Sequence, residues 1–513
     1  MINKYRLRFI VNIIIIVIVL VFTIPSLAYA ARGDLGYEGG ISSGSISGAS
    51  DLEYQELCFL SGKPFIFIGE LKIRTISRQG SVKSTYTYNL ENASLDASLK
   101  RTVIYETIVT EKGNGQTIEN TIVIGNPSEV IRIGNKVYTL RKYEMSKSDV
   151  IDKKPAISYV AGNLWGKKTY RVGNLNNEGN VTVESIGEIY GYDQIWSAAE
   201  SGTINYTIQS EEVKDGEVDS WGGTGKVTFS QTTTKLMKYI VNEPDQISFD
   251  GGYIEERHSN SILEYELKIP EFDSFGASTD RIISLKDTLK MESFPVQERL
   301  PVPQLNHLRG HWAENDIKTL FSLEIIRDEP TRFNPSQFIN RQEFTAAVVN
   351  ATREAVEEET VKTGIFSRFS KKEEEEVESP FVDVSPENPN FKDISYAYES
   401  GIINGKESGV FAPDDYVMVA DAITIFIRAI GLERLAPNPG AVTAFKDNDS
   451  IPSYARDAIY AAQRIGLVKG DDKGYVNANE YLTKDRAAAL LNRFIDYMRT
   501  GIQKDYRERM FNY

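Results

Sequence analysis

Three copies of one short pattern in the C-terminal third of the chain limit the possible folds more than any other feature of the sequence. The copies align without gaps over residues 317–326, 394–403 and 459–468. In each copy, apolar residues stand at the first, fourth, ninth and tenth positions. This spacing places the apolar residues on one face of a helix.

A second helix is predicted behind each copy, after a turn. These second helices are expected at residues 341–351, 420–430 and 484–497. The second helix motif follows the start of the pattern by 24 residues in the first copy and by 25 in the other two. Helix pairs of this length cannot bury their apolar faces alone, so we expect the three copies to pack together into one body.

The long segment before the repeats has the pattern of β-strands. Residues 102–110 are rich in β-branched and aromatic side chains, and Gly134-Asn135 separates two further apolar runs in the manner of a two-residue hairpin. We expect one large antiparallel β domain, or two smaller ones divided near residues 174–180. The predicted fold class is therefore multidomain α+β, with an antiparallel β-rich part followed by an α-helical bundle of three repeats.

The N-terminus has the features of an export signal. Lys4, Arg6 and Arg8 precede an uncharged apolar stretch over residues 9–27, and Ala28-Tyr29-Ala30 is a small-x-small cleavage pattern. The apolar stretch is also just long enough to remain as a membrane anchor. Both alternatives engage a membrane during export and place the rest of the chain outside the cytoplasm.

Charge and composition exclude several classes of partner. The formal net charge is −14, and a chain beginning at Ala31 has 55 basic and 72 acidic side chains, which gives −17. A surface this acidic argues against nucleic acid as a partner. Cys58 is the only cysteine and there are three histidines, so intrachain disulfides are excluded and little material remains for a metal site. We expect no metal and no cofactor.

Several motifs in the repeats resemble the S-layer homology (SLH) module. They are His311-Trp312-Ala313, Gly401-Ile402-Ile403-Asn404-Gly405, Gly466-Leu467-Val468-Lys469-Gly470 and Ile339-Asn340-Arg341-Gln342-Glu343. The resemblance covers about residues 305–500. It implies a pseudo-threefold arrangement with one helix of each module in a central bundle. It also implies grooves that bind a secondary cell-wall polysaccharide, which is often pyruvylated in that family.

The resemblance implies polysaccharide-binding residues as well. Arg341 matches the family arginine that contacts the anionic sugar, and Glu343 matches its acidic companion. Lys484 takes the arginine position in the third copy and Val419 takes it in the second. Trp312 is expected either to stack on a sugar ring or to plug the core. The alternative for Arg341 and Lys484 is an ordinary role as surface cations paired with nearby carboxylates.

Two other positions depart from the family pattern. Arg486 stands where the acidic companion belongs in the third copy, and Glu324 replaces the glycine found at Gly401 and Gly466. We therefore expect one intact groove and one substituted groove. From physical chemistry alone, a cation in the first turn of a helix lies beside free backbone N–H groups and the positive end of the helix dipole, which suits a carboxylate ligand.

Signals for catalysis are weak. Residues 40–44 fit the G-x-S-x-G pattern, but they lie in a Gly- and Ser-rich lead-in and not between a strand and a helix. Glu255 and Glu256 could supply a glycosidase pair, which requires a set separation of two carboxylates that a sequence does not give. Asp447 and Asp449 resemble the start of a calcium loop without its glycine and terminal glutamate, so a turn role is expected. No catalytic residue is assigned.

These observations divide the chain and suggest its role. The expected order is a signal peptide at 1–30, a lead-in at 31–50, one or two β-rich extracellular domains at 51–290, a Pro-containing linker at 291–306, the first module at 307–352, a charged insertion at 353–379, the second module at 380–440, the third module at 441–500 and a C-terminal tail at 501–513. We expect a non-enzymatic bacterial surface protein that is anchored to wall polysaccharide, has S-layer neighbours as further candidate partners, and displays a structural or binding β domain. A wall-tethered polysaccharide hydrolase with its site in residues 51–290 is the alternative, and a third reading is that the modules are only a scaffold.

Overall fold

The computed structural model describes most of the chain after the N-terminal segment. The described residues are 39–43, 51–78, 80–113, 115–173, 178–214, 217–240, 252–274, 276–353, 379–437 and 441–511. The expected signal peptide and nearly all of the charged insertion lie outside them. Within these residues, no helix combines the length and the apolar character needed to cross a membrane.

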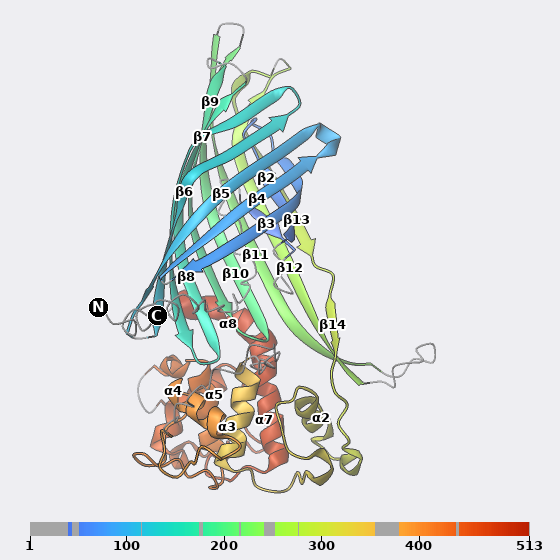
Figure 1. Ribbon diagram of the computed structural model, residues 1–513, viewed down its shortest axis with the longest axis vertical. Helices are drawn as coiled ribbons and strands as arrows, with labels where there is room; N and C mark the ends of the chain where they lie inside the picture. Colours follow the sequence, from blue (N-terminus) through green and yellow to red (C-terminus); the bar gives the residue numbers. More distant parts are fainter. Residues whose placement is uncertain are drawn as a thin grey trace, which may run out of the picture.

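The N-terminal half of the described chain is one antiparallel sheet of fourteen strands (Figure 1). The first thirteen strands pair in chain order, and β14 pairs with β12. The strands are β1 (Gly40–Ser42), β2 (Asp51–Cys58), β3 (Phe65–Arg78), β4 (Ser81–Asn92), β5 (Ala97–Glu111), β6 (Gln116–Ile133), β7 (Lys136–Lys154), β8 (Ile157–Val172), β9 (Gly179–Asp193), β10 (Ser197–Lys214), β11 (Glu217–Ile240), β12 (Gly252–Phe272), β13 (Ser278–Glu292) and β14 (Val296–Arg299).

The sheet confirms the predicted antiparallel β part. Gly134 and Asn135 form the expected two-residue turn between β6 and β7, and Gly134 has a φ of 55°. The alternative of two domains is wrong, because β8 and β9 pair directly across the proposed division. Residues 296–299 of the expected linker form β14.

The sheet curls until its first strand meets its last ones. The Ser261 hydroxyl of β12 donates to the carbonyl oxygen of Ser42 in β1 at 2.7 Å, and the Gln231 amide of β11 donates to the Ser42 hydroxyl at 3.2 Å. This curl gives the sheet an inner face that is closed from solvent.

The inner face contains a buried network of charges from four strands. The Arg101 guanidinium of β5 donates to Glu56 of β2 at 2.8 Å and to Glu129 of β6 at 2.9 Å. The Lys168 ammonium of β8 donates to the other oxygen of Glu129 at 2.8 Å. All four side chains are fully buried. Burial alone would raise the pKa of Glu129, but Arg101 and Lys168 together lower it to about 2, so this carboxylate stays ionised.

Seven α-helices follow in the described chain; the first six lie below one end of the sheet, and the last lies level with the lower ends of the strands (Figure 1). They are α2 (Glu314–Ser322), α3 (Arg341–Thr352), α4 (Phe391–Glu399), α5 (Val419–Ala429), α6 (Arg456–Arg464), α7 (Lys484–Asp496) and α8 (Ile502–Phe511). The three predicted second helices are confirmed as α3, α5 and α7. Each predicted first helix ends before its apolar pattern does. The ninth and tenth positions of the pattern lie beyond the last helical residue. The expected C-terminal tail forms α8.

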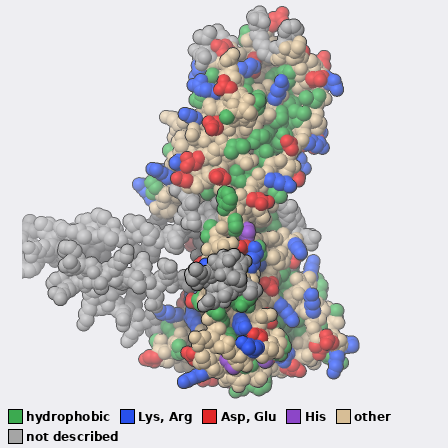
Figure 2. Space-filling view, turned by 90° about the vertical axis from the view of Figure 1, so that its right-hand side faces the viewer, with side chains coloured by type: hydrophobic (Ala, Val, Ile, Leu, Met, Phe, Trp, Pro, Cys, Tyr) green, Lys and Arg blue, Asp and Glu red, His purple; other side chains and the backbone are tan. Residues whose placement is uncertain are grey.

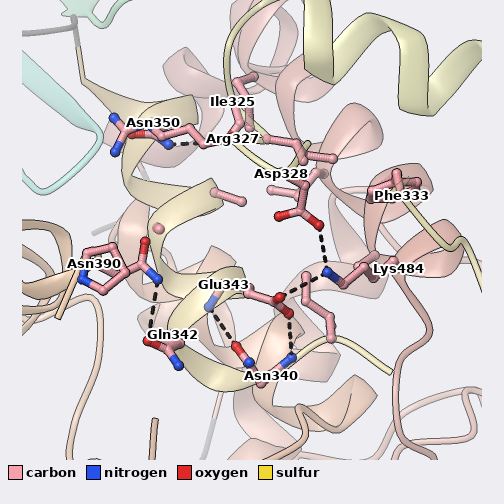
Figure 3. Close-up of a pocket in the computed structure, with 18 residues that line it drawn as sticks. Ile325, Arg327, Asp328, Phe333, Asn340, Gln342, Glu343, Asn350, Asn390 and Lys484 are labelled. Atoms are coloured by element: carbon pink, nitrogen blue, oxygen red, sulfur yellow. Dashed lines mark hydrogen bonds and ion pairs between the residues drawn. The ribbon is translucent and has the colours of Figure 1, made fainter. Parts of the chain in front are cut away.

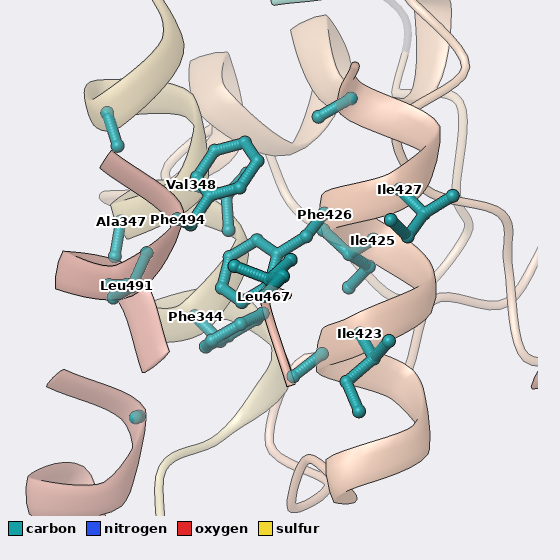
Figure 4. Close-up of a cluster of buried hydrophobic side chains, with 14 of the residues drawn as sticks. Phe344, Ala347, Val348, Ile423, Ile425, Phe426, Ile427, Leu467, Leu491 and Phe494 are labelled. Carbon is teal, nitrogen blue, oxygen red and sulfur yellow. The ribbon is translucent and has the colours of Figure 1, made fainter. Parts of the chain in front are cut away.

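The three second helices form a central bundle, as expected (Figure 4). The ring of Phe426 from α5 lies 5.6 Å from Phe344 of α3 and 4.6 Å from Phe494 of α7. Just before these helices, the three chain segments join in a closed ring of backbone hydrogen bonds. In this ring Ile339 donates to Leu482 at 3.0 Å, Leu482 donates to Val417 at 2.8 Å, and Val417 donates to Ile339 at 3.1 Å. The repeat therefore folds with pseudo-threefold symmetry.

The bundle docks on the sheet through the C-terminal ends of α3 and α5 and through the π-helical segment Tyr497–Gly501 that follows α7. Carbonyl groups there accept hydrogen bonds from the β7–β8 and β9–β10 turns, and at the ends of α3 and α5 these carbonyls have no partner within their own helix. The donors and acceptors are the Trp196 indole and Ala351 (2.8 Å), the Ala156 backbone and Ala429 (2.8 Å), and the Ser197 hydroxyl and Met498 (2.8 Å). Ile157, Tyr192 and Trp196 belong to the same apolar core as the bundle. The sheet and the bundle are thus one packed unit.

The outer face of the sheet keeps several large apolar side chains in contact with solvent. Ile76, Ile186 and Ile282 are among those that are more than half exposed. Figure 2 shows hydrophobic side chains gathered on the sheet half of the molecule, with charged groups around them.

Candidate functional site

Each central helix begins against a turn of a neighbouring module, and these contacts define three module junctions. The first backbone N–H of each helix donates to a carbonyl of that turn: Arg341 to Asp415 at 2.9 Å, Val419 to Glu480 at 3.0 Å and Lys484 to Gln337 at 2.8 Å. We name the junction at Lys484 junction A, that at Arg341 junction B and that at Val419 junction C.

These contacts correct the expectation of free backbone donors beside the motif cation. In α3 the N–H groups of Arg341 and Gln342 donate to Asp415 and Pro413, and that of Glu343 donates to the Asn340 side chain at 2.9 Å. The first turn is therefore already satisfied, and recognition of a ligand must come from side chains.

Five equivalent positions build each junction, and the repeat aligns them. Two of them lie on central helices: the first residue of one and the third residue of the next. The third position ends the turn that follows the first helix of a module (α2, α4 or α6), and the fourth is the aromatic position of the following turn. The fifth is the residue five places before the apolar pattern. In junction A these are Lys484, Glu343, Asp328, Phe333 and Pro389; in junction B, Arg341, Asp421, Gly405, Phe411 and Tyr454; in junction C, Val419, Arg486, Gly470, Val476 and Trp312.

Junction A holds its cation in an ion-paired cluster (Figure 3). The Lys484 ammonium lies 2.6 Å from Asp328 and 2.9 Å from Glu343, and its side chain is only 8% exposed. Burial alone would lower the pKa of Lys484, but the hydrogen bonds and charges of the two carboxylates raise it above its ordinary value. The cluster borders a cavity of about 400 Å³. In junction A, two negatively charged carboxylates thus neutralise the single positive charge of Lys484.

Junction B holds its cation without a carboxylate partner. The Arg341 guanidinium donates to the carbonyl oxygens of Phe411 at 2.9 Å and Asn404 at 3.4 Å, and it lies 4.9 Å from the centre of the Phe411 ring. Within the described residues Arg341 forms no ion pair. These contacts fix the guanidinium plane while its charge stays unneutralised, which suits recognition of an anion.

An exposed tyrosine lies on the other side of junction B. The Tyr454 hydroxyl donates to Asp421 at 2.7 Å, and the side chain is 54% exposed. Burial of the hydroxyl and its hydrogen bond to Asp421 raise the pKa of Tyr454, and the nearby charge of Arg341 opposes that rise. The phenol is therefore held by its polar end and presents its ring to solvent.

Junction C lacks the usual cation and the aromatic ring beneath it. Val419 and Val476 occupy those two positions, and Arg486 occupies the position of the acidic companion. Trp312 donates its indole N–H to Asp485 at 3.0 Å and is 62% exposed. These residues border a cavity of about 210 Å³.

The four predicted binding residues do not share one site. Lys484 and Glu343 meet in junction A, Arg341 lies in junction B, and Trp312 lies in junction C. Sequence reasoning missed Tyr454 and Asp328. Both had a signal in the repeat, because Tyr454 precedes Ile459 by five residues as Trp312 precedes Ile317, and Asp328 aligns with Gly405 and Gly470.

Polar side chains from the preceding loops hold the aromatic turns in place. Asp447 accepts the backbone N–H of Val476 at 2.9 Å, and Asp383 accepts that of Phe411 at 2.9 Å. In the first module His307 contacts the matching turn with the opposite direction, because its Nε2 donates to the carbonyl oxygen of Phe333 at 2.9 Å. The expected turn role of Asp447 is confirmed.

The weak catalytic candidates of the sheet are engaged in structure. Ser42 is buried in β1 with both its oxygens hydrogen-bonded, so its hydroxyl is not presented on an elbow between a strand and a helix; residue 44 of the motif lies outside the described residues. Glu256 accepts hydrogen bonds from Lys238, His258 and Gln297. These hydrogen bonds, led by that of Lys238, lower the pKa of Glu256 and keep its carboxylate ionised.

Comparison with known proteins identifies the repeats. The family model of the S-layer homology domain matches residues 305–345, 380–417 and 444–486. The chain is 24% identical over 206 residues to the "Surface-layer 125 kDa protein" of Lysinibacillus sphaericus. The matched region covers 39% of this chain and 16% of that protein. The chain therefore carries three S-layer homology domains, and these domains indicate an extracellular position on the bacterial surface.

Two further relatives are named as enzymes. The chain is 29% identical over 183 residues to the "Endoglucanase" of Bacillus sp. (strain KSM-635), which covers 35% of this chain and 17% of that protein. It is 25% identical over 296 residues to the "Exoglucanase XynX" of Acetivibrio thermocellus, covering 54% and 25% respectively. The chain thus spans a quarter or less of the length of these relatives.

These names contradict the expectation that the chain is not an enzyme, and that expectation is corrected. Both relatives carry the names of enzymes, and they match this chain at 29% and 25% identity. The three S-layer homology domains indicate that this is a surface protein anchored to the cell wall.

Proposed function

We propose that the helical bundle binds an anionic polysaccharide of the bacterial cell wall, and that junction B is its principal contact. The observation that carries this proposal is the state of Arg341. Its guanidinium is fixed by two carbonyl groups and the Phe411 ring, yet no carboxylate neutralises it within the described residues. A planar guanidinium can grip a carboxylate or a phosphate of a glycan with two parallel hydrogen bonds.

Junction A is less suited to an anion. Lys484 already contacts two carboxylates and is almost fully covered, so an incoming anion would be repelled by Asp328 and Glu343. In this proposal Lys484 instead holds the third module against the first, which closes the pseudo-threefold ring.

Co-sedimentation of the full chain with purified wall sacculi tests the proposal. We expect the chain to pellet with untreated sacculi and to stay in solution after the secondary polymer has been extracted. Arg341→Ala should weaken binding about tenfold or more, because it removes charge-assisted hydrogen bonds to the glycan. Arg341→Lys should lie between, because lysine keeps the charge and loses the planar fork.

Arg281→Ala is the matched control, because Arg281 lies in β13 of the sheet and is 74% exposed. It should pellet as the unchanged chain does. Equal binding of Arg341→Ala and the unchanged chain would refute the role of junction B, and binding to extracted sacculi would refute a polysaccharide ligand.

A second proposal follows from the named relatives: the sheet, held at the wall by the bundle, acts on a polysaccharide as a glycoside hydrolase. Its support is the similarity to an endoglucanase and an exoglucanase. Incubation of the full chain with soluble β-glucan, xylan and pullulan, followed by measurement of new reducing ends, tests it. Release above a heat-inactivated sample would support hydrolysis, and no release from any substrate would count against it.

A further inference from the structure

The last long strand of the sheet has a free edge. β13 pairs with β12, and no other strand of the described chain pairs with it. The Thr288 backbone N–H points to this edge, since it donates to the neighbouring Asp287 carboxylate at 2.8 Å and not to a strand. β13 is 15 residues long and contains neither Gly nor Pro. A long strand with unpaired backbone groups along one edge is a template for another strand.

The first edge of the sheet is protected in a way that β13 is not. β1 is only three residues long, and its Ser42 is hydrogen-bonded to Ser261 of β12 and Gln231 of β11. Short and covered edge strands are common means by which a sheet avoids pairing with other chains. Within the described residues β13 is neither short nor paired on its outer side, so it is the edge that is open to a partner.

Apolar side chains lie on both faces of β13. Ile282 is on the outer face and is 60% exposed, whereas Leu285 packs against the inner core of the sheet and is only partly buried. Figure 2 views the side of the molecule on which β13 lies in Figure 1, and it shows hydrophobic side chains gathered there between charged ones. Apolar surface with a polar rim is typical of a protein interaction site.

Two opposite charges are placed symmetrically about Ser284 in this strand. Arg281 precedes Ser284 by three residues and Asp287 follows it by three, so alternation along the strand puts both charges on the same face. Arg281 is 74% exposed and its partner Glu271 is 44% exposed, which makes that ion pair weak. Asp287 is exposed and forms no ion pair within the described chain.

This symmetry selects one way of pairing two copies of β13. When two such strands lie antiparallel with Ser284 opposite Ser284, Arg281 of each copy lies opposite Asp287 of the other. Opposite charges at such cross-strand positions stabilise a pair of strands, and like charges destabilise it. The charges of one copy are therefore complementary to those of a second copy.

Neighbouring registers lose this complementarity. In the register centred on Ser284, Ile283 lies opposite Leu285 and no two like charges are opposed. A register centred on Leu285 would place Asp287 opposite Ile283. A register centred on Lys286 would place Lys286 opposite its own copy, which is repulsive.

We infer that a second copy of this chain pairs with the free edge of β13, antiparallel and centred on Ser284, so that two sheets become one. The two-fold symmetry of such a contact uses the same residues twice, as isologous interfaces do. Backbone hydrogen bonds between the strands provide affinity, and the charge pairs set the register. A contact confined to one strand buries little surface, so the dimer is transient.

Disulfide trapping of the full chain tests the register. Opposite residues in an antiparallel pair have Cα atoms about 5.5 Å apart or less, within the range of a disulfide. Ser284→Cys should therefore give a covalent dimer under mild oxidation on a non-reducing gel. Ile282→Cys is the matched control, because the two Ile282 positions would be about 13 Å apart. The unchanged chain should stay uncrosslinked, since Cys58 is buried.

Charge exchange tests the affinity. Sedimentation equilibrium at about 100 µM, a concentration suited to a transient contact, should show dimers of the unchanged chain. Arg281→Asp and Asp287→Arg should each weaken dimerisation about tenfold, because each turns two attractive pairs into two repulsive ones. The double variant should restore it, whereas a merely local effect on β13 would not be reversed.

Three results would overturn the inference: a monomer at this concentration, equal crosslinking of Ser284→Cys and Ile282→Cys, or no recovery in the double variant. Equal thermal unfolding of all variants excludes misfolding as the cause. The inference is independent of the proposal for the wall, because junction B lies in the bundle. Monomeric Arg281→Asp should still pellet with sacculi.

Discussion

Glu324 is held in a backbone conformation that the repeat assigns to glycine. Its φ is 55°, and the equivalent Gly401 and Gly466 have φ values of 78° and 75°. A side chain in the left-handed region costs about 1–2 kcal/mol, and glycine costs about 0.5–1 kcal/mol in backbone entropy. We therefore expect Glu324→Gly to raise the free energy of unfolding by about 0.5–1 kcal/mol, as measured by urea denaturation. Gly466→Ala, the matched control, should lower it, and a destabilised Glu324→Gly would contradict the argument.

Single residues also show what a sequence can and cannot give for the site. The spacing of the repeat located Arg341 and Lys484 at the starts of two helices. It did not give their partners, because the carboxylate of Asp328 lies 156 positions from Lys484 and reaches it only through the packing of the modules. Whether a motif cation is already neutralised is therefore a property of the tertiary structure.

Within the sheet, the charge network around Glu129 joins β6 to β5 and β8, so the stability of one strand depends on the others. Replacing Glu129 by Gln removes the negative charge that lies between the buried cations Arg101 and Lys168, so we expect Glu129→Gln to lower the free energy of unfolding at pH 7 by about 3–5 kcal/mol. The measurement is urea denaturation followed by the far-UV signal of the sheet. Glu144→Gln is the matched control, because Glu144 pairs with Lys142 on the exposed face and should change stability by about 0.5 kcal/mol or less.

The same network predicts a dependence on pH. The folded pKa of Glu129 is about 2, below the ordinary value of about 4.3 in an unfolded chain. A lowered folded pKa gives stability that is fully present above the unfolded value and is lost as pH falls toward the folded one. The difference between the unchanged chain and Glu129→Gln should therefore shrink between about pH 4 and pH 2, and a constant difference across this range would contradict the assignment.

Turns and helix starts, which depend on residues close together in the chain, were predicted well from the sequence. The Gly134-Asn135 turn and the starts of α3 and α7 depend on neighbouring residues, and they are confirmed. The curl of the sheet and its charge network depend on strands that are far apart in the chain. Arg101 meets Glu56 at a separation of 45 residues and Glu129 at 28, and alternation along a strand shows only which face is buried.

The whole molecule differs most from what the sequence suggested. The sequence predicted a Pro-containing linker at residues 291–306 between the β part and the repeats. The structure instead docks the bundle on the sheet, through Trp196 and the two strand turns beside it. Trp196 had no distinguishing signal, because an aromatic residue between two strands is as typical of a sheet core as of an interface.

This docking predicts that the sheet and the bundle unfold together. Trp196 donates to the Ala351 carbonyl of α3 at 2.8 Å and lies 4.5 Å from the Arg499 guanidinium, in the π-helical segment after α7. Trp196→Ala removes both contacts and should lower the free energy that couples the sheet to the bundle by about 3–5 kcal/mol. We expect calorimetry to show one cooperative transition for the unchanged chain and two for Trp196→Ala. Trp165→Ala, on the outer face of the sheet, should keep one transition. If the unchanged chain already unfolds in two steps, the interface does not couple the parts, and the wall anchor and the displayed sheet are mechanically independent.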